Sequence, residues 1–498
     1  MNLLKKIKRE YWILTGILFL TFFARFPSLF EPFWYGDEGI FAAVARNLNL
    51  GGVLYQTAWD NKPPMIYLTY QAIFKYLGVS MFSLHLVASC VVLTTSVVIY
   101  EIALFVMGQK RAFLATAIFG ILSSLRIVEG NLALTEIFMI LPISLAMWLA
   151  IWRKFDFKAL FVSGLLFGIA SLFKQVGALE AGALGLFLFL YTKSFFDFMK
   201  KGIFLTLGFF CPYAITFLYF APKNLTADWI FAAYTYYRIY LGESPKYAVL
   251  VNILKFMPIV AVIFYGLLKK LGKLKSAETL GADVFHLFLL WMAFSFLGSY
   301  FSGRTYGHYM VQALPALALV LSSVNFKPQI KRVQVIFALF FFVPLIFLTK
   351  LLFSDFFSGG PVVQINYYKN FIEFAAGKKT LAQYNNYFDN NVNKIMALSD
   401  FLAAEGLNGT SVYIWGDIPW LYAISDLKNP SRYVTSFHVF GVPNGKEEVL
   451  GDLGKNMPGV IILPKSSIGY FDGLENLLSK KYTLQLQIDD SRIFAKSK

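Results

Sequence analysis

The chain has 498 residues, of which 57% are hydrophobic, 18% are aromatic and 15% are charged. An ordinary soluble domain is about 45–50% apolar and about 25% charged, so the composition excludes a soluble globular protein and indicates a membrane protein. The net charge of +16 would suggest a nucleic-acid partner in a soluble protein. However, residues 354–498 hold 14 basic and 14 acidic side chains, so the whole excess lies among the apolar runs of residues 1–353. There it signals membrane topology and no nucleic-acid partner.

A transmembrane helix needs about 20 apolar residues, and eleven runs come near that length. They are Trp12–Phe30, Phe82–Phe105, Ala112–Leu125, Leu132–Ile151, Ala159–Phe173, Val176–Tyr191, Ile203–Phe220, Tyr247–Leu268, Val284–Phe301, Tyr309–Val324 and Val333–Leu352. Gly164 and Gly168 in the fifth run are expected to form a helix-packing contact. The sequence thus predicts a mostly α, polytopic membrane protein with about 11 transmembrane helices.

The distribution of Lys and Arg between the loops predicts the orientation of the chain. With a cytoplasmic N-terminus, the inward-facing segments carry 19 basic residues and the outward loops about nine, which fits the positive-inside rule. An odd number of helices then places residues 354–498 outside the cytoplasm. We expect a multi-pass protein of the cell (plasma) membrane with a cytoplasmic N-terminus.

The first outer loop, residues 31–81, is too long to lack structure of its own. After Asp37, apolar residues recur at helical spacing as far as Gly51-Gly52, and a second helical pattern begins at Pro63-Pro64 and ends at Gly78. We expect two amphipathic helices that lie along the outer membrane interface.

From about Asp355 the composition becomes that of a soluble domain. The patterns predict a small α/β domain over residues 354–498, with the Asn-rich stretch Tyr384–Asn390 as its linker. Its expected elements are a helix at Asn391–Glu405, strands at Ser411–Trp415 and Val460–Leu463, a helix at Asp472–Lys480 and a hairpin of Tyr482–Ile488 with Arg492–Ala495.

Two adjacent carboxylates, Asp37 and Glu38, follow the first apolar run. Asp37 suits an N-cap of the next helix, and it also suits a general base or a metal ligand at the membrane surface. Glu129 and Glu136 form a second acidic pair, seven residues apart, which a continuous helix would place on one face. Glu136 lies in an apolar run, where an ionisable residue indicates a function; the alternative is an interfacial residue that faces water.

Basic residues at the outer ends of the apolar runs are a third feature. Lys174 follows the fifth run, and Arg304 and His308 precede the tenth. Each alone suits a snorkelling anchor, whereas together with outer carboxylates they suit an anionic lipid headgroup. His85 and His438 are expected to be structural.

Several stretches share residues and spacing with one family. They are Arg25, Gly36-Asp37-Glu38, Ala45-Arg46-Asn47-Leu48, Gly52, Tyr55, Lys62-Pro63-Pro64 and Gly78, then Val128-Glu129-Gly130, Leu134-Thr135-Glu136, Ser171-Leu172-Phe173-Lys174-Gln175, Gly307-His308-Tyr309 and Val412-Tyr413-Ile414-Trp415-Gly416. These stretches closely resemble the GT-C membrane glycosyltransferases. Within them they are most similar to the protein O-mannosyltransferase and aminoarabinose-transferase branch.

The resemblance implies an inverting glycosyltransferase that moves a monosaccharide from a polyprenyl-phosphate donor to an acceptor hydroxyl on the outer face of the membrane. Asp37 would take the proton of the acceptor, and Glu38 would support Asp37 or the acceptor site. The residues that would bind the donor phosphate are Lys174, Arg304, His308, Tyr309 and Lys62.

The implied partners are the lipid-linked donor, the bilayer and a protein, lipid or glycan acceptor. Some family members bind a divalent cation between acidic residues of the first two outer loops and others need none. No cofactor is therefore certain, and a divalent cation stays open with Glu136 or Glu129 as its ligand. On this view residues 1–353 are the transmembrane catalytic domain and residues 354–498 an extracytoplasmic α/β domain.

Two other kinds of protein also have about a dozen apolar helices. One is a polytopic transporter or flippase for a lipid-linked sugar, but transporters commonly show paired repeats and broken helices at the midplane. Here the unusual residues gather on one face and no repeat is visible. The other is an O-antigen ligase or polymerase-like enzyme, which typically places its key residues in a long late outer loop, whereas this chain has its motif in the first.

Overall fold

The computed structural model describes residues 9–241, 248–270, 280–304, 306–323, 332–352, 354–465 and 469–497. The chain divides into two compact units. Unit 1 consists of Met1–Pro27, Val87–Leu218 and Glu243–Tyr367, and unit 2 consists of Ser28–Leu86, Tyr219–Gly242 and Tyr368–Lys498. The first outer loop therefore belongs to the same unit as the C-terminal part of the chain, and this division does not follow the linear boundary between residues 353 and 354.

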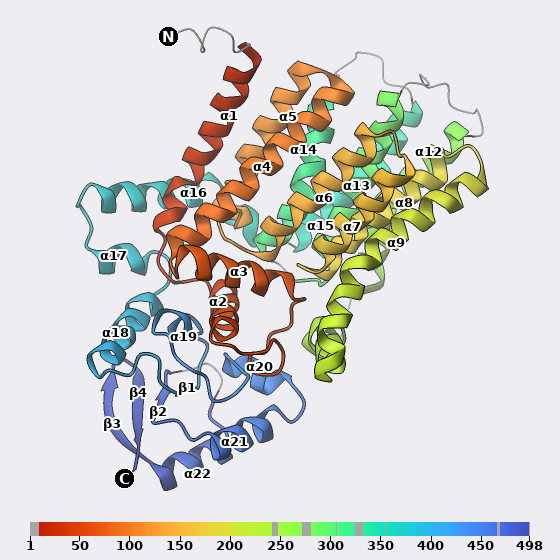
Figure 1. Cartoon of the computed structure of the whole chain (residues 1–498). Coiled ribbons are helices and arrows are strands. Elements are labelled where there is room, and N and C mark those ends of the chain that lie inside the picture. The colour runs from red at the N-terminus through yellow and green to blue at the C-terminus, as the bar shows by residue number, and fades with distance from the viewer. Residues whose placement is uncertain are drawn as a thin grey trace. The chain divides into compact units, whose positions relative to one another are not determined.

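Long apolar helices lie side by side in unit 1 (Figure 1), and each of the eleven predicted runs is helical over most of its length. They are α1 (Arg9–Arg25), α4 (Met81–Met107), α5 (Gln109–Leu122), α6 (Thr135–Trp152), α7 (Phe157–Ser171), α8 (Leu179–Tyr191), α9 (Phe195–Phe220), α12 (Ala248–Lys270), α13 (Leu280–Tyr300), α14 (Leu314–Ser323) and α15 (Arg332–Leu352), followed by α16 (Ser354–Ala375). The mostly α fold that the sequence predicts is confirmed.

Six described helical segments are long and apolar enough to cross a membrane. They are Glu10–Phe30, Met81–Met107, Thr135–Trp152, Phe195–Lys223, Leu250–Lys269 and Asp283–Tyr300. Phe157–Ser171, Gln175–Tyr191 and Val335–Leu351 are shorter apolar helices, and the two remaining runs form α5 and α14, of 14 and 10 residues. The lengths and composition are those of a polytopic membrane protein.

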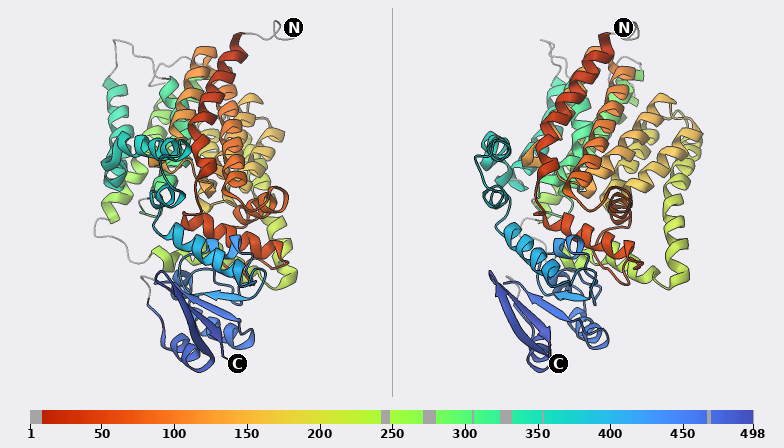
Figure 2. Two further views of the ribbon diagram at one scale, coloured as in Figure 1. Left: turned by 90° about the vertical axis from the view of Figure 1, so that its left-hand side faces the viewer. Right: turned by 60° about the vertical axis from the view of Figure 1, so that its left-hand side comes forward.

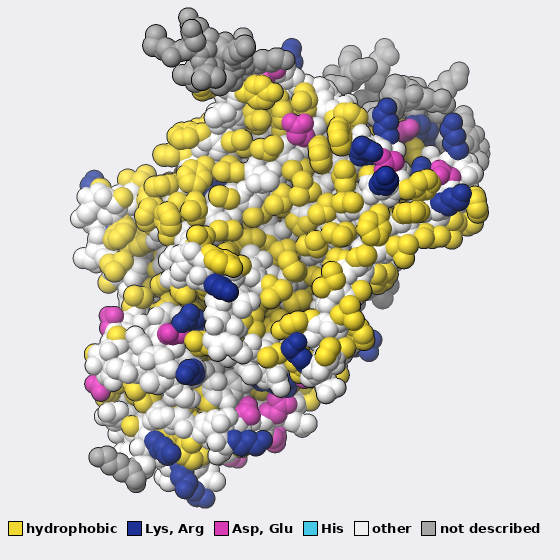
Figure 3. Space-filling model, viewed as in Figure 1, with side chains coloured by type: hydrophobic (Ala, Val, Ile, Leu, Met, Phe, Trp, Pro, Cys, Tyr) yellow, Lys and Arg dark blue, Asp and Glu magenta, His cyan; other side chains and the backbone are white. Residues whose placement is uncertain are grey.

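The surface of the helical unit is hydrophobic. Large apolar side chains are exposed on it, among them Ile215 at 70%, Phe264 at 63% and Ile346 at 66%. Figure 3 shows hydrophobic side chains over much of these helices, with Lys and Arg gathered at one end of the bundle. An apolar surface of this extent indicates contact with lipid or with another protein. Because several of these helices are long enough to span a membrane, we infer contact with lipid.

Glycines allow α7 and α9 to pack backbone to backbone. A Cβ at Gly164 would lie 2.1 Å from the Leu205 carbonyl oxygen, and one at Gly168 would lie 2.3 Å from the Phe209 carbonyl oxygen. Small residues at this spacing let membrane helices approach closely, which confirms the packing role predicted for the pair.

We predict that Gly164→Leu destabilises the bundle by about 1–3 kcal/mol, because the new side chain must push the two backbones apart. Thermal unfolding of the detergent-purified protein measures the effect. Gly202→Leu on α9 is the matched control, since a Cβ there meets no atom within 4 Å. Equal melting temperatures for the two variants would contradict the packing assignment.

Three short 3-10 segments join the helices of unit 1: η3 (Arg126–Val128), η4 (Gln175–Ala178) and η7 (Gly307–Ala313). η7 contacts both η3 and α6. Gly307 makes the approach to η3 possible, because a Cβ there would lie 2.5 Å from the Ile127 carbonyl oxygen. These segments hold the side chains next to them against the ends of the helices.

The two helices predicted for the first loop are present in unit 2 as α2 (Gly36–Asn49) and α3 (Met65–Leu77). They pack through Phe41, whose ring centre lies 6.0 Å from that of Tyr67 and 5.6 Å from that of Tyr70. Gly78 ends α3 with a positive φ of 83°, a backbone conformation that glycine adopts easily.

The C-terminal part of unit 2 contains a four-stranded sheet in the order β1-β2-β4-β3 (Figure 2). β1 (Val412–Ile414) and β2 (Val460–Leu463) are parallel, and the hairpin of β3 (Tyr482–Ile488) and β4 (Ser491–Lys496) adds antiparallel strands. The helices of unit 2 also include α10 (Thr226–Ile230), α11 (Tyr237–Leu241), α17 (Leu381–Asn386), α18 (Asn391–Ala404), α19 (Trp420–Ile424), α20 (Ser436–Gly441), α21 (Gly445–Lys455) and α22 (Asp472–Lys481). The predicted small α/β fold is confirmed.

The linker expected at Tyr384–Asn390 is wrong in part. Residues up to Asn386 belong to α17, which begins with a capping box of Thr380 and Gln383. Tyr384 is 1% exposed and stacks on Phe374 at 4.4 Å between ring centres. The Asn-rich composition does not predict this helix. The helix depends on its capping box and on the packing of Tyr384 against Phe374.

Within unit 2, the first loop and the C-terminal part are packed together. Trp420 of α19 donates its indole N–H to the Tyr35 carbonyl oxygen at 3.0 Å. Gly39 leaves room for that indole, because a Cβ there would lie 2.8 Å from the ring. Arg46 of α2 forms an ion pair with Asp426. The C-terminal part therefore shapes the surroundings of the first turn of α2.

Candidate active site

Asp37 lies half-buried in the first turn of α2. The helix begins at Gly36, its N-cap is Tyr35, and no side chain caps it, so Asp37 does not act as the N-cap that the sequence allows. In the part of the chain that the structure describes, its carboxylate has no hydrogen-bond or ion-pair partner. A carboxylate is favoured at a helix N-terminus. The Asp37 carboxylate is therefore available to accept a hydrogen bond or a proton from a bound molecule.

Glu38, the next residue, is fully buried, and its carboxylate points to His85. Glu38 Oε1 lies 2.9 Å from His85 Nε2, and His85 Nδ1 lies 2.6 Å from the Ser28 carbonyl oxygen. Glu38 and His85 are both 0% exposed. The two acids of the sequence motif therefore occupy different environments.

Lys62 is held through its backbone by two buried tyrosines. Tyr55 donates its hydroxyl to the Lys62 carbonyl oxygen at 2.8 Å, and the Lys62 N–H donates to the hydroxyl of Tyr67 at 3.1 Å. Tyr67 in turn donates to Asp60 Oδ2 at 2.6 Å. Burial and the charge of Asp60 hold the pKa of Tyr67 well above its ordinary value, so the hydroxyl stays a donor.

His438 of the C-terminal part belongs to the same surroundings. Its Nε2 lies 3.3 Å from Asp60 Oδ1, and its ring is 2% exposed. Burial lowers the pKa of His438 below its ordinary value. The negative charges of Asp60 and Asp37 oppose this shift, and the positive charge of Lys62 adds to it. Sequence reasoning missed this neighbourhood, because no pattern links residues almost 400 positions apart.

In unit 1, Glu136 and Lys174 form a buried ion pair. Glu136 is 1% exposed, and its Oε1 lies 2.5 Å from Lys174 Nζ. Thr135 donates to the other oxygen, Oε2, at 2.7 Å. The ammonium also lies 3.6 Å from the centre of the Tyr309 ring, a cation–π contact. Lys174, a predicted phosphate-binding residue, therefore contacts both Glu136, a predicted metal ligand, and Tyr309, a second predicted phosphate-binding residue.

Glu129 and His308 form the second pair in unit 1. Glu129 ends η3 in the left-handed conformation with φ 51°, and its Oε2 accepts from the His308 ring at 2.5 Å and from the His308 N–H at 3.2 Å. Burial alone would raise the pKa of Glu129, but the hydrogen bonds from His308 lower it below its ordinary value. The His308 ring lies 4.8 Å from that of Tyr309, which connects the two pairs.

Arg25 holds the loop that carries Glu129. Its guanidinium is 1% exposed and donates to the Gly130 carbonyl oxygen at 2.5 Å, to the Ser123 carbonyl oxygen at 2.8 Å and to Ser89 Oγ at 3.1 Å. A buried arginine that makes several such bonds fixes backbone geometry. The remaining predicted residue, Arg304, lies exposed in the loop before η7.

Residues 61–220 match the family model described as dolichyl-phosphate-mannose-protein mannosyltransferase, and no curated protein matches the sequence. Crystal structures of ArnT from Cupriavidus metallidurans are similar over almost the whole chain. The complex with undecaprenyl phosphate has a TM-score of 0.56 at 14% identity and covers 98% of each chain. The apo structure has a TM-score of 0.54 at 13% identity and covers 97% of each chain.

The chain therefore shares its fold with ArnT, and residues 61–220 match a mannosyltransferase family model. The resemblance predicted from the first loop is thereby confirmed. A more remote structure, the archaeal oligosaccharyltransferase AglB from Archaeoglobus fulgidus, has a TM-score of 0.43 at 11% identity and covers 91% of this chain and 69% of its own.

The two carboxylates that the sequence suggests as metal ligands already have hydrogen-bond partners. Glu136 accepts from an ammonium and Glu129 from an imidazole. Within the described ranges, no three His, Cys, Asp or Glu side chains are grouped so that they could hold a metal ion. These residues do not fit metal ligation as they stand, and the function proposed below uses no metal.

A third polar cluster lies among the helices of unit 1, and it was not predicted from the sequence. Glu180 of α8 is 0% exposed, and its Oε1 accepts from Ser295 at 2.9 Å and from Gln312 at 2.8 Å. Gln312 also donates to the Val176 carbonyl oxygen at 3.3 Å. The amide therefore joins η7, which contains His308, to η4, which follows Lys174. A glutamate within an apolar run was the available signal.

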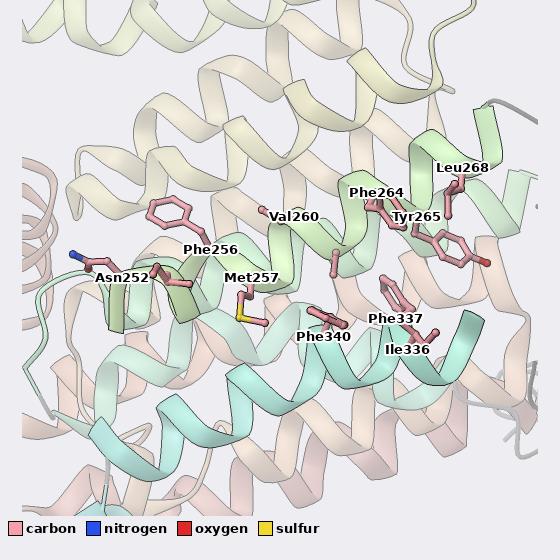
Figure 4. Close-up of a pocket in the computed structure, with 12 residues that line it drawn as sticks. Asn252, Phe256, Met257, Val260, Phe264, Tyr265, Leu268, Ile336, Phe337 and Phe340 are labelled. Carbon is pink, nitrogen blue, oxygen red and sulfur yellow. The ribbon is translucent and has the colours of Figure 1, made fainter. Parts of the chain in front are cut away.

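An apolar cavity of about 890 Å³ lies between α12 and α15 (Figure 4). Its lining includes Phe256, Val260 and Phe264 from α12 and Phe337 and Phe340 from α15. Figure 4 shows the lining side chains spread along α12, whereas those of α15 lie close together. The cavity suits a flexible hydrocarbon chain, because it offers contact area and few polar groups.

We predict that Lys174→Met lowers the stability of the protein by about 3–5 kcal/mol, because it strands the buried charge of Glu136. The double variant Lys174→Met/Glu136→Gln should recover most of this loss, since both charges are then removed. Chemical unfolding in detergent measures both variants. A single variant as stable as the wild type would contradict the buried pair.

Proposed function

We propose that this protein is an inverting glycosyltransferase that transfers a monosaccharide from a polyprenyl-phosphate donor to an acceptor hydroxyl. The observation that carries the proposal is Asp37, a half-buried carboxylate without a partner among the described residues, in the motif that the GT-C resemblance marks as the catalytic one. Asp37 would take the proton of the acceptor hydroxyl as the acceptor oxygen bonds to the anomeric carbon. The bond from that carbon to the phosphate oxygen breaks, and its electron pair leaves with the lipid phosphate.

The proposal assigns charge stabilisation to the basic side chains of unit 1. Lys174 and His308 are held in place by Glu136 and Glu129, so their positions are fixed before a donor binds, which is how enzymes stabilise a developing anion most effectively. Arg304 lies exposed in the loop four residues before His308, where a guanidinium suits bidentate contact with a phosphate. The resemblance implies a phosphate-binding role for Lys62 as well.

Two observations support a lipid-borne donor. The apolar cavity between α12 and α15 matches an isoprenoid chain in chemistry, and the similar ArnT structure holds undecaprenyl phosphate. We infer that the donor lipid lies among the helices of unit 1 with its phosphate at the outer interface. The excess of basic residues in the inward loops supports a cytoplasmic N-terminus and an extracytoplasmic C-terminal part in the cell membrane.

We predict that Asp37→Asn folds normally but loses at least a hundredfold in transfer rate, because the amide cannot accept the acceptor proton. The assay measures radiolabel passing from a panel of undecaprenyl-phosphate monosaccharides, mannose first, into the acceptors of native membranes. Asp472→Asn on α22 is the control, an exposed carboxylate in the first turn of a helix. Near-wild-type turnover of Asp37→Asn would remove Asp37 as the base, and labelled donor that only crosses the membrane would indicate a flippase.

We predict that Arg304→Ala and Lys174→Met/Glu136→Gln raise the KM for the donor, because both remove positive charge that would meet the lipid phosphate. The double variant is used because it avoids the stability loss expected of the single one. Binding of undecaprenyl phosphate, measured by the shift of the melting temperature, gives an independent readout. Unchanged KM and unchanged binding in both variants would refute the phosphate assignment.

A further inference from the structure

The geometry of the Glu38–His85 contact determines how many protons the two side chains share. His85 Nδ1 lies 2.6 Å from the Ser28 carbonyl oxygen, and because a carbonyl oxygen can only accept, Nδ1 carries a hydrogen. Nε2 of the same ring faces Glu38 Oε1 at 2.9 Å. Two acceptors would repel each other at that distance, so one proton lies between them. The pair is either carboxylate with imidazolium or carboxylic acid with neutral imidazole, and its net charge is zero in both states.

The same geometry separates Glu38 from its neighbour Asp37. Successive residues of a helix point about 100° apart, and the Glu38 side chain is fully buried whereas Asp37 is half-exposed. His85 stands in α4, Glu38 in α2 and Ser28 in the 3-10 segment Phe26–Phe30. The imidazole therefore joins the 3-10 segment and the N-terminal part of α4 to the first turn of α2.

We propose that His85 is a positioning residue that binds Glu38 and balances its charge, so that Asp37 is the acid of the motif whose charge the pair leaves uncompensated and its helix turn is held in place. Glu38 then takes no proton from the acceptor and needs no negative charge of its own. The proposal rests on the proposed function for its kinetic readouts, and it assigns to a histidine outside the motif a role in shaping the site.

The alternative is that the carboxylate of Glu38 acts directly, as a second base or by binding the acceptor. The two views differ in one substitution. A glutamine at position 38 can donate its amide N–H to His85 Nε2 while Nδ1 still donates to Ser28, so the hydrogen-bond chain survives without the acidic group. If the carboxylate acts directly, the same glutamine removes the function.

The experiment compares Glu38→Gln, Glu38→Ala, His85→Ala and the double alanine variant in the undecaprenyl-phosphate-mannose assay, or with the panel sugar that gives the highest transfer. We expect Glu38→Gln to keep kcat within about threefold of the wild type. The other three should lose at least tenfold in kcat with the donor KM changed by less than threefold. The double alanine variant should lose no more than the worse of the two single variants, because residues that act as one unit are not additive.

Two results would overturn the proposal: a Glu38→Gln variant that folds but is as inactive as Asp37→Asn, or losses in the two alanine variants that simply add. The melting temperature provides a test without turnover, in which Glu38→Gln matches the wild type and both alanine variants melt lower by non-additive amounts. If the wild type transfers no sugar from any donor of the panel, the proposed function fails, and the melting temperatures alone decide whether His85 and Glu38 form the pair.

Discussion

A charge in an apolar interior is stable only when an opposite charge or hydrogen bonds accompany it, and the candidate site is built around this constraint. Glu136 is paired with Lys174, and Glu38 with His85. Each pair joins separate elements of its unit, so electrostatic compensation also fixes the relative positions of those elements. Asp37 is the exception among the motif acids, because it is half-exposed and has no partner among the described residues. That difference identifies the group able to exchange a proton.

The helices provide rigid supports, and short irregular segments at their ends carry candidate site residues of unit 1. η3, η4 and η7 join the helices next to Glu129, Lys174 and His308, and hydrogen bonds from Gln312 and Arg25 hold two of these segments. Irregular backbone within a membrane protein is tolerated where protein covers it. Its unpaired backbone groups then serve as attachment points for buried side chains, which gives the reactive groups fixed positions.

The C-terminal part is a structural component of unit 2 and is not simply appended to it. Trp420 packs on Gly39 of α2, and His438 reaches Asp60 beside Lys62. The surroundings of both Asp37 and Lys62 therefore depend on residues beyond position 400. A purely linear division into a membrane domain and a soluble domain misses this dependence, because packing joins segments that the chain separates.

The sequence by itself determined the apolar helices, the two helices of the first loop, the sheet and the family resemblance, because apolar periodicity, Gly and Pro signals and motif spacing are local properties. It also identified Glu129, Glu136, Lys174 and His308, although it grouped them as metal and phosphate ligands. Only the tertiary structure decided that each of these acids is paired with one of these bases, and that Glu38 is paired with a histidine assigned to packing. Pairing depends on distances between side chains far apart in the chain, and no local pattern encodes such distances.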